Sequence, residues 1–268
     1  MIATDHTKTS LPFVSVITIC FNDPAGVLRT IQSVISQKYD NFEYILIDGG
    51  SDKETLDLIL QYSENYAYFA SEPDNGVYDA MNKGILHAKG EWYIMMNAGD
   101  IFASSTALFD NLNMISQFNH IIWAGGGSKI LTNTGTERYY FANREKHLFH
   151  HQSLFIKKEL HLKYGMYINN QHSQAWDYFF FCLIQNEPFL ETGLLVAICD
   201  GGGRSSSVAN YLHVCAIDFI FGNKSRLTLA LYLLLYPLYR ILFKCASMVI
   251  ININKFKKFH SVFSFNLH

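Results

Sequence analysis

Two hydrophobic periods alternate along the first hundred residues of the chain. Short apolar runs rich in β-branched residues, typical of buried strands, are separated by segments whose apolar residues recur at helical spacing. Strands are expected at residues 13–20, 43–48, 67–71 and 91–96, and helices at 27–37, 53–63 and 76–90. Because one helix lies in each crossover between strands, this order predicts an α/β fold with a mostly parallel sheet flanked by helices.

The pattern is looser after about residue 120. Short strands of a mixed edge are expected at "HIIWAGG", "KILTN" and "TERYYF", a helix at "AWDYFFFCLIQN", a strand at "LLVAIC" and a helix at "VANYLHVCAIDFIFG". The stretch "DGGGRSSS" is expected to be a loop. We therefore place one α/β domain over residues 1–222 and an apolar helical appendage over residues 223–268.

The appendage combines an apolar stretch with basic residues. Residues 227–239 carry no charge, yet this run is shorter than the roughly 20 apolar residues that span a bilayer. Pro237 predicts a kink, and Arg240 and Lys244 share a helical face ahead of Lys255, Lys257 and Lys258. We expect a helix in the membrane interface, with a helix packed on the α/β domain and a true membrane span as alternatives.

Composition narrows the class of protein. Hydrophobic residues make up 49% of the chain and charged residues 16%, which is ample for a core. The net charge of −2 gives no basic field for nucleic acid. Five cysteines without CxxC spacing predict reduced core thiols, and the polar N-terminus lacks the apolar stretch of a signal peptide, so we do not expect a secreted protein.

Polar residues stand where the predicted parallel strands end. Asn22 follows the first strand, Asp48 ends the second, and Asn97 and Asp100 follow the strand at 91–96. In open α/β sheets, ligands bind beyond the carboxyl ends of the strands. These residues are therefore candidates for a shared binding site.

Four motifs in order resemble a known family. "VSVITICFN", "YILIDGGSDKET", "SEPDNGVYDAMNKGILHAKGEW" and "MMNAGD" are similar to the N-terminal half of family 2 glycosyltransferases, inverting enzymes with a Rossmann-like GT-A fold. The bacterial enzymes of O-antigen, colanic acid and other exopolysaccharide synthesis are the most similar in kind. The resemblance is close over residues 12–102 and looser over 145–205. It implies a nucleotide-sugar-binding half at 12–102 and an acceptor half at 103–222.

The resemblance implies a divalent cation, Mg²⁺ or Mn²⁺, bound by Asp100. This residue matches the metal-binding aspartate of the family's DxD motif, while Ala98 stands where another aspartate is often found. Asn97, assigned to the nucleotide-sugar site, offers only a neutral oxygen. One carboxylate with phosphates and waters is still a reasonable site, because Mg²⁺ uses few carboxylates. The structural alternative is an Asx turn that closes the strand.

Other matched residues are expected to contact the nucleotide sugar. Asp48 lies in the loop that contacts the nucleobase, but Gly49 replaces the usual second acid, so Asp48 either contacts the base or supports the loop. Phe21 either stacks on the base or is an ordinary core residue. Asp74 resembles a second base-contacting position. Asp79 either faces the crevice or forms a surface ion pair with Lys83.

The acceptor half holds the expected base. Inversion by single displacement needs a group that takes the proton of the acceptor hydroxyl. In the family this is an aspartate at the start of a helix, which Asp177 in "QAWDYFFFCL" matches; the alternative is a helix-capping role.

Further contacts to the diphosphate or acceptor are expected from the same half. In "HLFHHQSLFIKK", read as a strand, only one of His150 and His151 would point inward, and we favour His151. Arg204 lies in a loop expected to close over the donor, with a solvent-facing Arg as the alternative.

The sequence lacks GxGxxG after the first strand, GxxxxGK[ST] and GxSxG, which argues against dinucleotide-binding, P-loop and α/β-hydrolase functions. We expect a metal-dependent hexosyl- or N-acetylhexosaminyl-transferase that uses a UDP-sugar and a polyprenyl-diphosphate-linked saccharide in surface polysaccharide synthesis. It would sit peripherally on the cytoplasmic face of the bacterial inner membrane. A non-catalytic scaffold and a nucleotidyltransferase are the alternatives.

Overall fold

The computed structural model describes residues 13–131, 136–170, 173–200 and 208–225, together with residues 227, 230, 231, 234 and 235. The chain divides into two compact units, Met1–Ser206 and Ser207–His268. The boundary predicted from the sequence was after residue 222. The roles predicted for residues 1–222 and 223–268 stay predictions.

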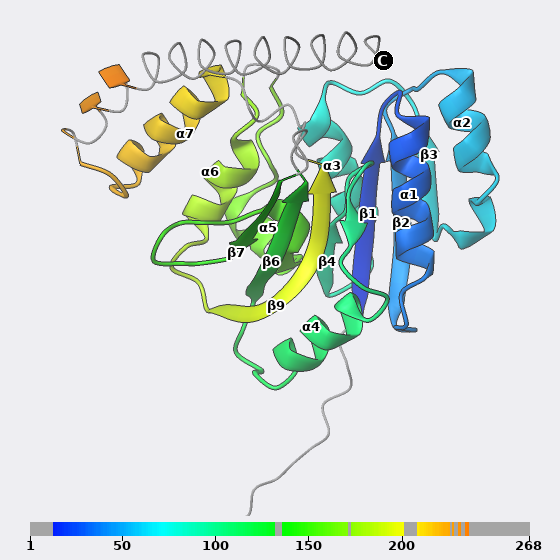
Figure 1. Cartoon of the computed structure of the whole chain (residues 1–268), viewed down its shortest axis with the longest axis horizontal. Helices are drawn as coiled ribbons and strands as arrows, with labels where there is room; N and C mark the ends of the chain where they lie inside the picture. Colours follow the sequence, from blue (N-terminus) through cyan, green and yellow to red (C-terminus); the bar gives the residue numbers. More distant parts are fainter. Residues whose placement is uncertain are drawn as a thin grey trace, which may run out of the picture. The chain divides into compact units, whose positions relative to one another are not determined.

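The first half of the larger unit has the predicted alternation. Parallel strands run in the order β3 (Tyr68–Ser71), β2 (Phe42–Asp48), β1 (Val14–Cys20), β4 (Trp92–Met95). The crossovers contain α1 (Pro24–Ile35), α2 (Lys53–Leu60) with the short 3₁₀ helix η1 (Ser63–Asn65), and α3 (Val77–His87) (Figure 1). Asp23 caps α1, its Oδ1 accepting from Gly26 N at 2.8 Å, and Pro24 follows at the first helical position.

The second half completes the sheet in a mixed arrangement. Beyond β4 follow β8 (Leu154–Lys157), β6 (Trp123–Leu131), β9 (Phe189–Asp200) and β5 (Ile101–Phe102), while β7 (Glu137–Phe141) pairs with β6. β6 runs parallel to β9 and antiparallel to β7 and β8. The helices here are α4 (Ala107–Ile115), α5 (Glu159–Tyr164), α6 (Trp176–Leu183) and the 3₁₀ helix η2 (His151–Ser153).

Three details differ from the sequence prediction. "HIIWAGG" and "KILTN" were expected as two strands, but the end of the first and the start of the second belong to the single strand β6. His150 and His151 were expected within a strand, but His151 begins η2 and the strand starts only at Leu154. The pattern also gave no prediction for α4 and α5, which are short helices of nine and six residues.

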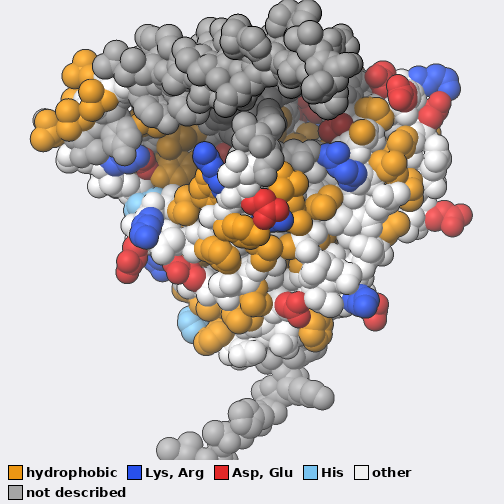
Figure 2. Space-filling model, viewed as in Figure 1, with side chains coloured by type: hydrophobic (Ala, Val, Ile, Leu, Met, Phe, Trp, Pro, Cys, Tyr) orange, Lys and Arg blue, Asp and Glu red, His pale blue; other side chains and the backbone are white. Residues whose placement is uncertain are grey.

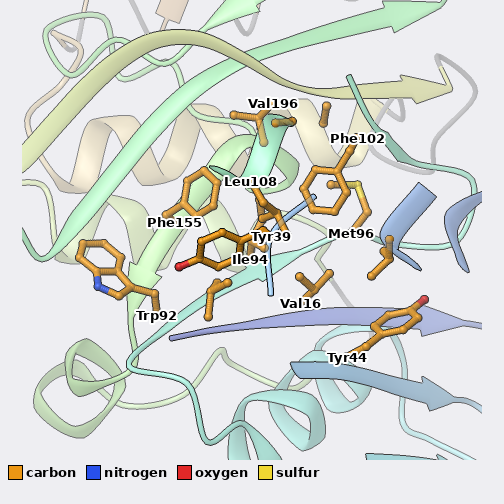
Figure 3. Close-up of a cluster of buried hydrophobic side chains, with 14 of the residues drawn as sticks. Val16, Tyr39, Tyr44, Trp92, Ile94, Met96, Phe102, Leu108, Phe155 and Val196 are labelled. Atoms are coloured by element: carbon orange, nitrogen blue, oxygen red, sulfur yellow. The ribbon is translucent and has the colours of Figure 1, made fainter. Parts of the chain in front are cut away.

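Alternate side chains of each central strand enter opposite cores. Figure 3 shows the core in which Val16 of β1 and Trp92, Ile94 and Met96 of the β4 segment point the same way. Helices α1, α2 and α4 contribute to this core. The intervening residues, such as Ile17 and Tyr93, enter a second core to which α3, α5 and α6 contribute. The sheet is thus covered on both faces, so its strand ends are left for binding.

The smaller unit contains α7 (Val208–Ile220). No helix in the described residues has the length and apolar character needed to cross a membrane. The predicted interfacial segment lies almost wholly outside the described residues. On the face shown in Figure 2, acidic and basic side chains are interspersed and neither sign dominates. Cys20 and Cys215 are buried thiols, as predicted, and burial raises the pKa of Cys20 to about 12.

Candidate active site

The turn after β4 positions Asn97 and Asp100. Asp100 N donates to Asn97 O at 2.9 Å, and Gly99 has a φ of +96°, which the third position of a type II turn requires. Thr30 of α1 fixes the turn, because its hydroxyl donates to Asp100 O at 2.7 Å and accepts from Gly99 N at 3.0 Å. The turn therefore lies at the carboxyl end of a central parallel strand, as predicted.

Asp100 is held by a residue that the sequence analysis missed. Gln152 of η2 donates from Nε2 to Asp100 Oδ2 at 3.0 Å. Asp100 is only 7% exposed, so this contact orients a carboxylate that is largely withdrawn from water. Gln152 directly follows His150 and His151 in the sequence, which was the only hint of a role in the site. No local spacing indicated that its partner is Asp100.

The same turn offers oxygen ligands for a divalent cation. Asn97 Oδ1 is buried and has no hydrogen-bond partner in the described residues. Together with the Asp100 carboxylate it forms an oxygen donor set with one charged member. No cluster of three or more His, Cys, Asp or Glu side chains suited to a metal occurs in the described residues. The set therefore fits a hard cation that takes most of its ligands from phosphates and water, such as Mg²⁺.

His151 joins this turn to α6. Its Nε2 lies 3.0 Å from Asn97 Nδ2, and its Nδ1 lies 3.0 Å from Asp177 Oδ2. Because a carboxylate can only accept, Nδ1 carries the proton. The structure thus brings three of the predicted residues, Asn97, His151 and Asp177, into one hydrogen-bonded chain, with Asp100 on the same turn.

Tyr78 of α3 holds the other oxygen of Asp177. Its hydroxyl donates to Asp177 Oδ1 at 2.9 Å and accepts from Trp176 N at 3.1 Å. Tyr178 N also donates to Asp177 Oδ1 at 2.9 Å. Tyr78 was not predicted from the sequence, because a tyrosine beside the apolar face of a helix gives no sign of a distant partner. We call Tyr78, Asn97, Asp100, His151, Gln152 and Asp177 the Asp177 cluster.

The charges of His151 and Asp177 support each other. Burial is the largest single influence on each and opposes its charged form. The mutual hydrogen bond and opposite charges outweigh burial, with help for Asp177 from the Tyr78 hydroxyl and Tyr178 N–H. The pKa of Asp177 therefore falls below its ordinary value, and that of His151 rises. Both shifts favour the ionised carboxylate of Asp177 and a retained proton on His151 Nδ1.

His150 points elsewhere. Its Nδ1 lies 2.7 Å from Ser128 Oγ, and its ring packs against Tyr140 with centroids 5.0 Å apart. Burial, with a contribution from His151, lowers the pKa of His150 to about 4. Although the pair is not in a strand, the expectation that the two rings diverge, with His151 toward the site, agrees with this geometry.

Asp48 supports the loops after β1 and β2. It is fully buried and accepts from Ser51 N at 3.0 Å, Ser51 Oγ at 2.5 Å and Ser71 Oγ at 2.7 Å. Ser51 Oγ in turn accepts from Asn22 N at 2.8 Å. Of the two roles that the sequence left open for Asp48, these contacts favour loop support.

Phe21, Gly49 and Asp74 meet beside these loops. Phe21 is 54% exposed, so it is not a core residue. A Cβ atom on Gly49 would lie 2.5 Å from Asp74 Oδ2 and 3.4 Å from Phe21 Cδ2. The exposed ring and the carboxylate therefore flank a glycine at the carboxyl edge of the sheet. We call these three residues the Phe21 cluster.

The remaining predicted residues lie apart from these contacts. Asp79 accepts from Asn75 N at 3.0 Å and from Asn169 Nδ2 at 2.9 Å, and its Oδ2 lies 3.5 Å from Lys83 Nζ. It thus joins two loops and also makes the ion pair that was the alternative prediction. Arg204 lies outside the described residues.

A hollow of about 570 Å³ contains none of the predicted site residues. It is lined by Phe141, Ala142, Asn143, Lys146, Leu148, Glu191 and Gly193. The candidate site is therefore defined by its side-chain contacts and by its place at the strand ends.

The family model described as "Glycosyl transferase family 2" matches residues 15–181. An uncharacterized glycosyltransferase of Mycobacterium tuberculosis is 35% identical over 170 residues, which cover 59% of this chain and 64% of that protein. A PGL/p-HBAD biosynthesis glycosyltransferase of Mycobacterium bovis is 36% identical over 92 residues, 33% of this chain and 36% of that protein. The chain thus matches less than two thirds of the length of these relatives.

Solved structures share the fold at low identity. TarS of S. aureus, residues 1–349, aligns with a TM-score of 0.64 and 16% identity over 81% of this chain and 67% of that one. The mannosyltransferase PcManGT of Pyrobaculum calidifontis, in complex with GDP-Man and Mn²⁺, aligns with a TM-score of 0.61 and 14% identity over 81% of this chain and 66% of that one. The α/β architecture is GT-A-like, with a mostly parallel sheet flanked by helices. With its motifs and the family match over residues 15–181, the chain belongs to glycosyltransferase family 2.

Proposed function

We propose that this protein is an inverting glycosyltransferase that moves a hexosyl or N-acetylhexosaminyl group from a nucleotide-diphosphate donor to a lipid-linked saccharide. The observation that carries the proposal is the pairing of Asp177 with His151 beside the turn that bears Asp100. The two acids have different partners, since Gln152 holds Asp100 and His151 holds Asp177. Such a pair suits two separate tasks, one at the leaving group and one at the acceptor.

Asp177 acts as the base in this proposal. It accepts the proton of the acceptor hydroxyl while that oxygen attacks the anomeric carbon from the side opposite the diphosphate. The bond between the anomeric carbon and the diphosphate oxygen breaks in the same step, and the nucleoside diphosphate leaves with the bonding electrons. The lowered pKa of Asp177 supports this role, because the base must be ionised at the start.

Asp100 and Asn97 would hold a divalent cation, Mg²⁺ or Mn²⁺. The buried, unpartnered Oδ1 of Asn97 and the carboxylate of Asp100 are the oxygen ligands on which this assignment rests. When bound, such a cation neutralises the charge of the departing diphosphate. Gln152 orients the Asp100 carboxylate for this purpose.

The proposed acceptor is a polyprenyl-diphosphate-linked saccharide of a surface polysaccharide such as O-antigen or exopolysaccharide. The apolar residues 227–239 and the following lysines support docking on the cytoplasmic face of a bacterial inner membrane. Docking there would raise the effective concentration of a lipid-linked acceptor. One relative is named for PGL/p-HBAD biosynthesis.

A donor screen tests this proposal. The full-length protein is incubated with Mn²⁺, polyprenyl-diphosphate saccharides and a panel of UDP- and GDP-sugars, and nucleotide release and lipid mass are recorded. We expect one donor to release its nucleotide only when both metal and acceptor are present, with a matching mass gain on the lipid. No transfer from any donor, together with no metal-dependent nucleotide binding, would favour a non-catalytic scaffold.

A further inference from the structure

The hollow lined by Phe141 and Glu191 lies where β7 and β9 flank β6 in the sheet (Figure 1). Its volume of about 570 Å³ is within the usual range of ligand pockets in proteins. No residue of the Asp177 cluster lines it. The hollow is therefore a feature of the fold that the proposed transfer reaction does not use.

An irregularity in the pairing of β6 with β9 forms one wall of the hollow. Gly125 pairs with Glu191 and Gly127 with Leu195, so β9 advances by four residues while β6 advances by two. Gly193 in this bulge has a φ of +67°, in the left-handed region that favours glycine. Bulges redirect side chains and often stand beside functional sites. Here the bulge brings Glu191 and Gly193 to the hollow.

Phe141 contributes an aromatic ring that is 43% exposed. A Cβ on Gly127 would lie 2.5, 2.8 and 3.1 Å from three atoms of this ring, so the glycine allows the ring to lie against β6. Part of the ring is thus packed on the strand, while the exposed part borders the hollow. A ring held in this way offers a fixed apolar surface to a ligand.

Three polar side chains around the hollow keep hydrogen-bonding capacity. Glu191 Oε1 accepts from Arg144 N at 2.8 Å, and no hydrogen bond to Oε2 comes from the described residues. Asn143 Oδ1 accepts from Lys146 N at 2.8 Å, which leaves the Nδ2 group of Asn143 as a donor. The Lys146 ammonium pairs with no acid in the described part of the chain. The hollow thus presents an acceptor and two donors beside the ring, with one charge of each sign.

We propose that this hollow is a saccharide-binding site separate from the Asp177 cluster. Sugar hydroxyl groups both donate and accept, so they match Glu191 Oε2, Asn143 Nδ2 and the Lys146 ammonium together. The C–H face of a pyranose ring packs on an aromatic ring such as that of Phe141. The carboxylate repels phosphate and the ammonium repels cations, which favours an uncharged ligand. In a glycosyltransferase, such a site holds a saccharide chain away from the bond that forms.

A ligand-observed NMR titration of the full-length protein, without donor or metal, tests the inference. The probes are chitotriose, cellotriose, mannotriose and maltotriose at millimolar concentration, with inorganic phosphate as the competing class of ligand. We expect at least one trisaccharide to bind the wild type and phosphate not to bind. Because no nucleotide is present, the titration reports on saccharide binding independently of transfer.

Two variants with matched controls locate the binding. Glu191→Gln can still accept from Arg144 N but loses its charge, and should weaken trisaccharide binding by about tenfold. Phe141→Leu keeps an apolar cover over β6 but removes the ring, and should weaken binding by about threefold to tenfold. The controls are Glu145→Gln, an exposed acid on the same turn as Lys146, and Phe118→Leu, which alters a ring that is 41% exposed. Both controls should bind like the wild type.

Thermal unfolding confirms that each variant is folded, and Glu191→Gln, an exposed position, keeps the test valid if Phe141→Leu does not fold. If no trisaccharide binds the wild type, or if the folded hollow variants bind within twofold of it, the inference is wrong. Binding of phosphate alone also overturns it. Failure of transfer in the donor screen would instead refute the proposed function and leave this result unaffected.

Discussion

The imidazole Nδ1 of His151 and the carboxylate Oδ2 of Asp177 lie 3.0 Å apart, across the junction of η2 and α6. The other ring nitrogen of His151 lies 3.0 Å from the amide of Asn97. One side chain therefore couples the turn after β4 to the helix that bears the proposed base. Substitutions in the Asp177 cluster are therefore expected to change the surroundings of Asp177 and, with them, the activity.

Tyr78→Phe should shift the pH dependence of transfer. The Tyr78 hydroxyl helps to lower the pKa of Asp177, so its loss raises that pKa. Because the base works when ionised, activity is lost as pH falls through the pKa of Asp177, and the acid limb of kcat/KM should move up by about one pH unit. Tyr139→Phe, which alters a largely exposed tyrosine, is the control. An unchanged acid limb in Tyr78→Phe would contradict the assignment.

Gln152→Ala should weaken metal-dependent nucleotide binding. The variant removes the donor that orients Asp100, so we expect about a tenfold loss of UDP affinity in Mn²⁺. Asp100→Ala should remove the metal-dependent part of binding, and chelation with EDTA should do the same to the wild type. Asp110→Ala, an exposed acid on α4, is the control. If Asp100→Ala binds UDP and Mn²⁺ as the wild type does, the metal assignment is wrong.

Gly99→Ala should destabilise the protein. Gly99 has a φ of +96°, and a side chain in this region costs about 1–2 kcal/mol. Urea unfolding measures the free energy of unfolding, with Ala98→Gly at the preceding position as the control. Equal stability of Gly99→Ala and the wild type would show that the turn adapts without strain.

His161→Gln should make stability less dependent on pH. His161 Nδ1 donates to Gly165 O, so Nε2 accepts from the Tyr93 hydroxyl, and burial lowers the pKa of His161 to about 4. The unfolded chain binds this proton at about pH 6.5, whereas the folded protein resists until about pH 4. The contribution of His161 therefore lowers the free energy of unfolding as pH falls from about 6.5 to about 4.

The expected size of this effect follows from the two pKa values. Between pH 7 and pH 5 the wild type should lose about 2 kcal/mol more free energy of unfolding than His161→Gln. Urea unfolding at both pH values measures the difference. Parallel losses in the two proteins would mean that the folded protein protonates His161 as readily as the unfolded chain does, and would contradict the lowered pKa.

The sequence predicted the first half of the fold because each element there has its own period. The strands β1 and β2 are short and mostly apolar, and α1 repeats Val27, Ile31 and Val34 on one face. β6 was divided because its three consecutive glycines, residues 125–127, interrupt the apolar pattern. These glycines are set by packing: a Cβ on Gly127 would lie 2.5 Å from the Phe141 ring. Such cross-strand contacts are not encoded in a local period.

The site shows the same division between local and distant signals. Asp100, Asn97 and Asp48 could be predicted because they end parallel strands that share an edge. Tyr78 and Gln152 could not, since their partners lie 99 and 52 residues away in the chain. The pairing of Asp74 with Gly49 likewise depends on a distance between loops that no sequence spacing gives.

The rate of sugar transfer by Asp177→Asn tests the central claim most directly. It is measured as nucleotide release with the identified donor and a lipid-linked saccharide at saturating Mn²⁺, with donor affinity determined on the same preparation. The account predicts a loss of about 100-fold or more in turnover, the contribution of a positioned base, with donor affinity close to that of the wild type. Turnover within threefold of the wild type would contradict the assignment of Asp177 as the base.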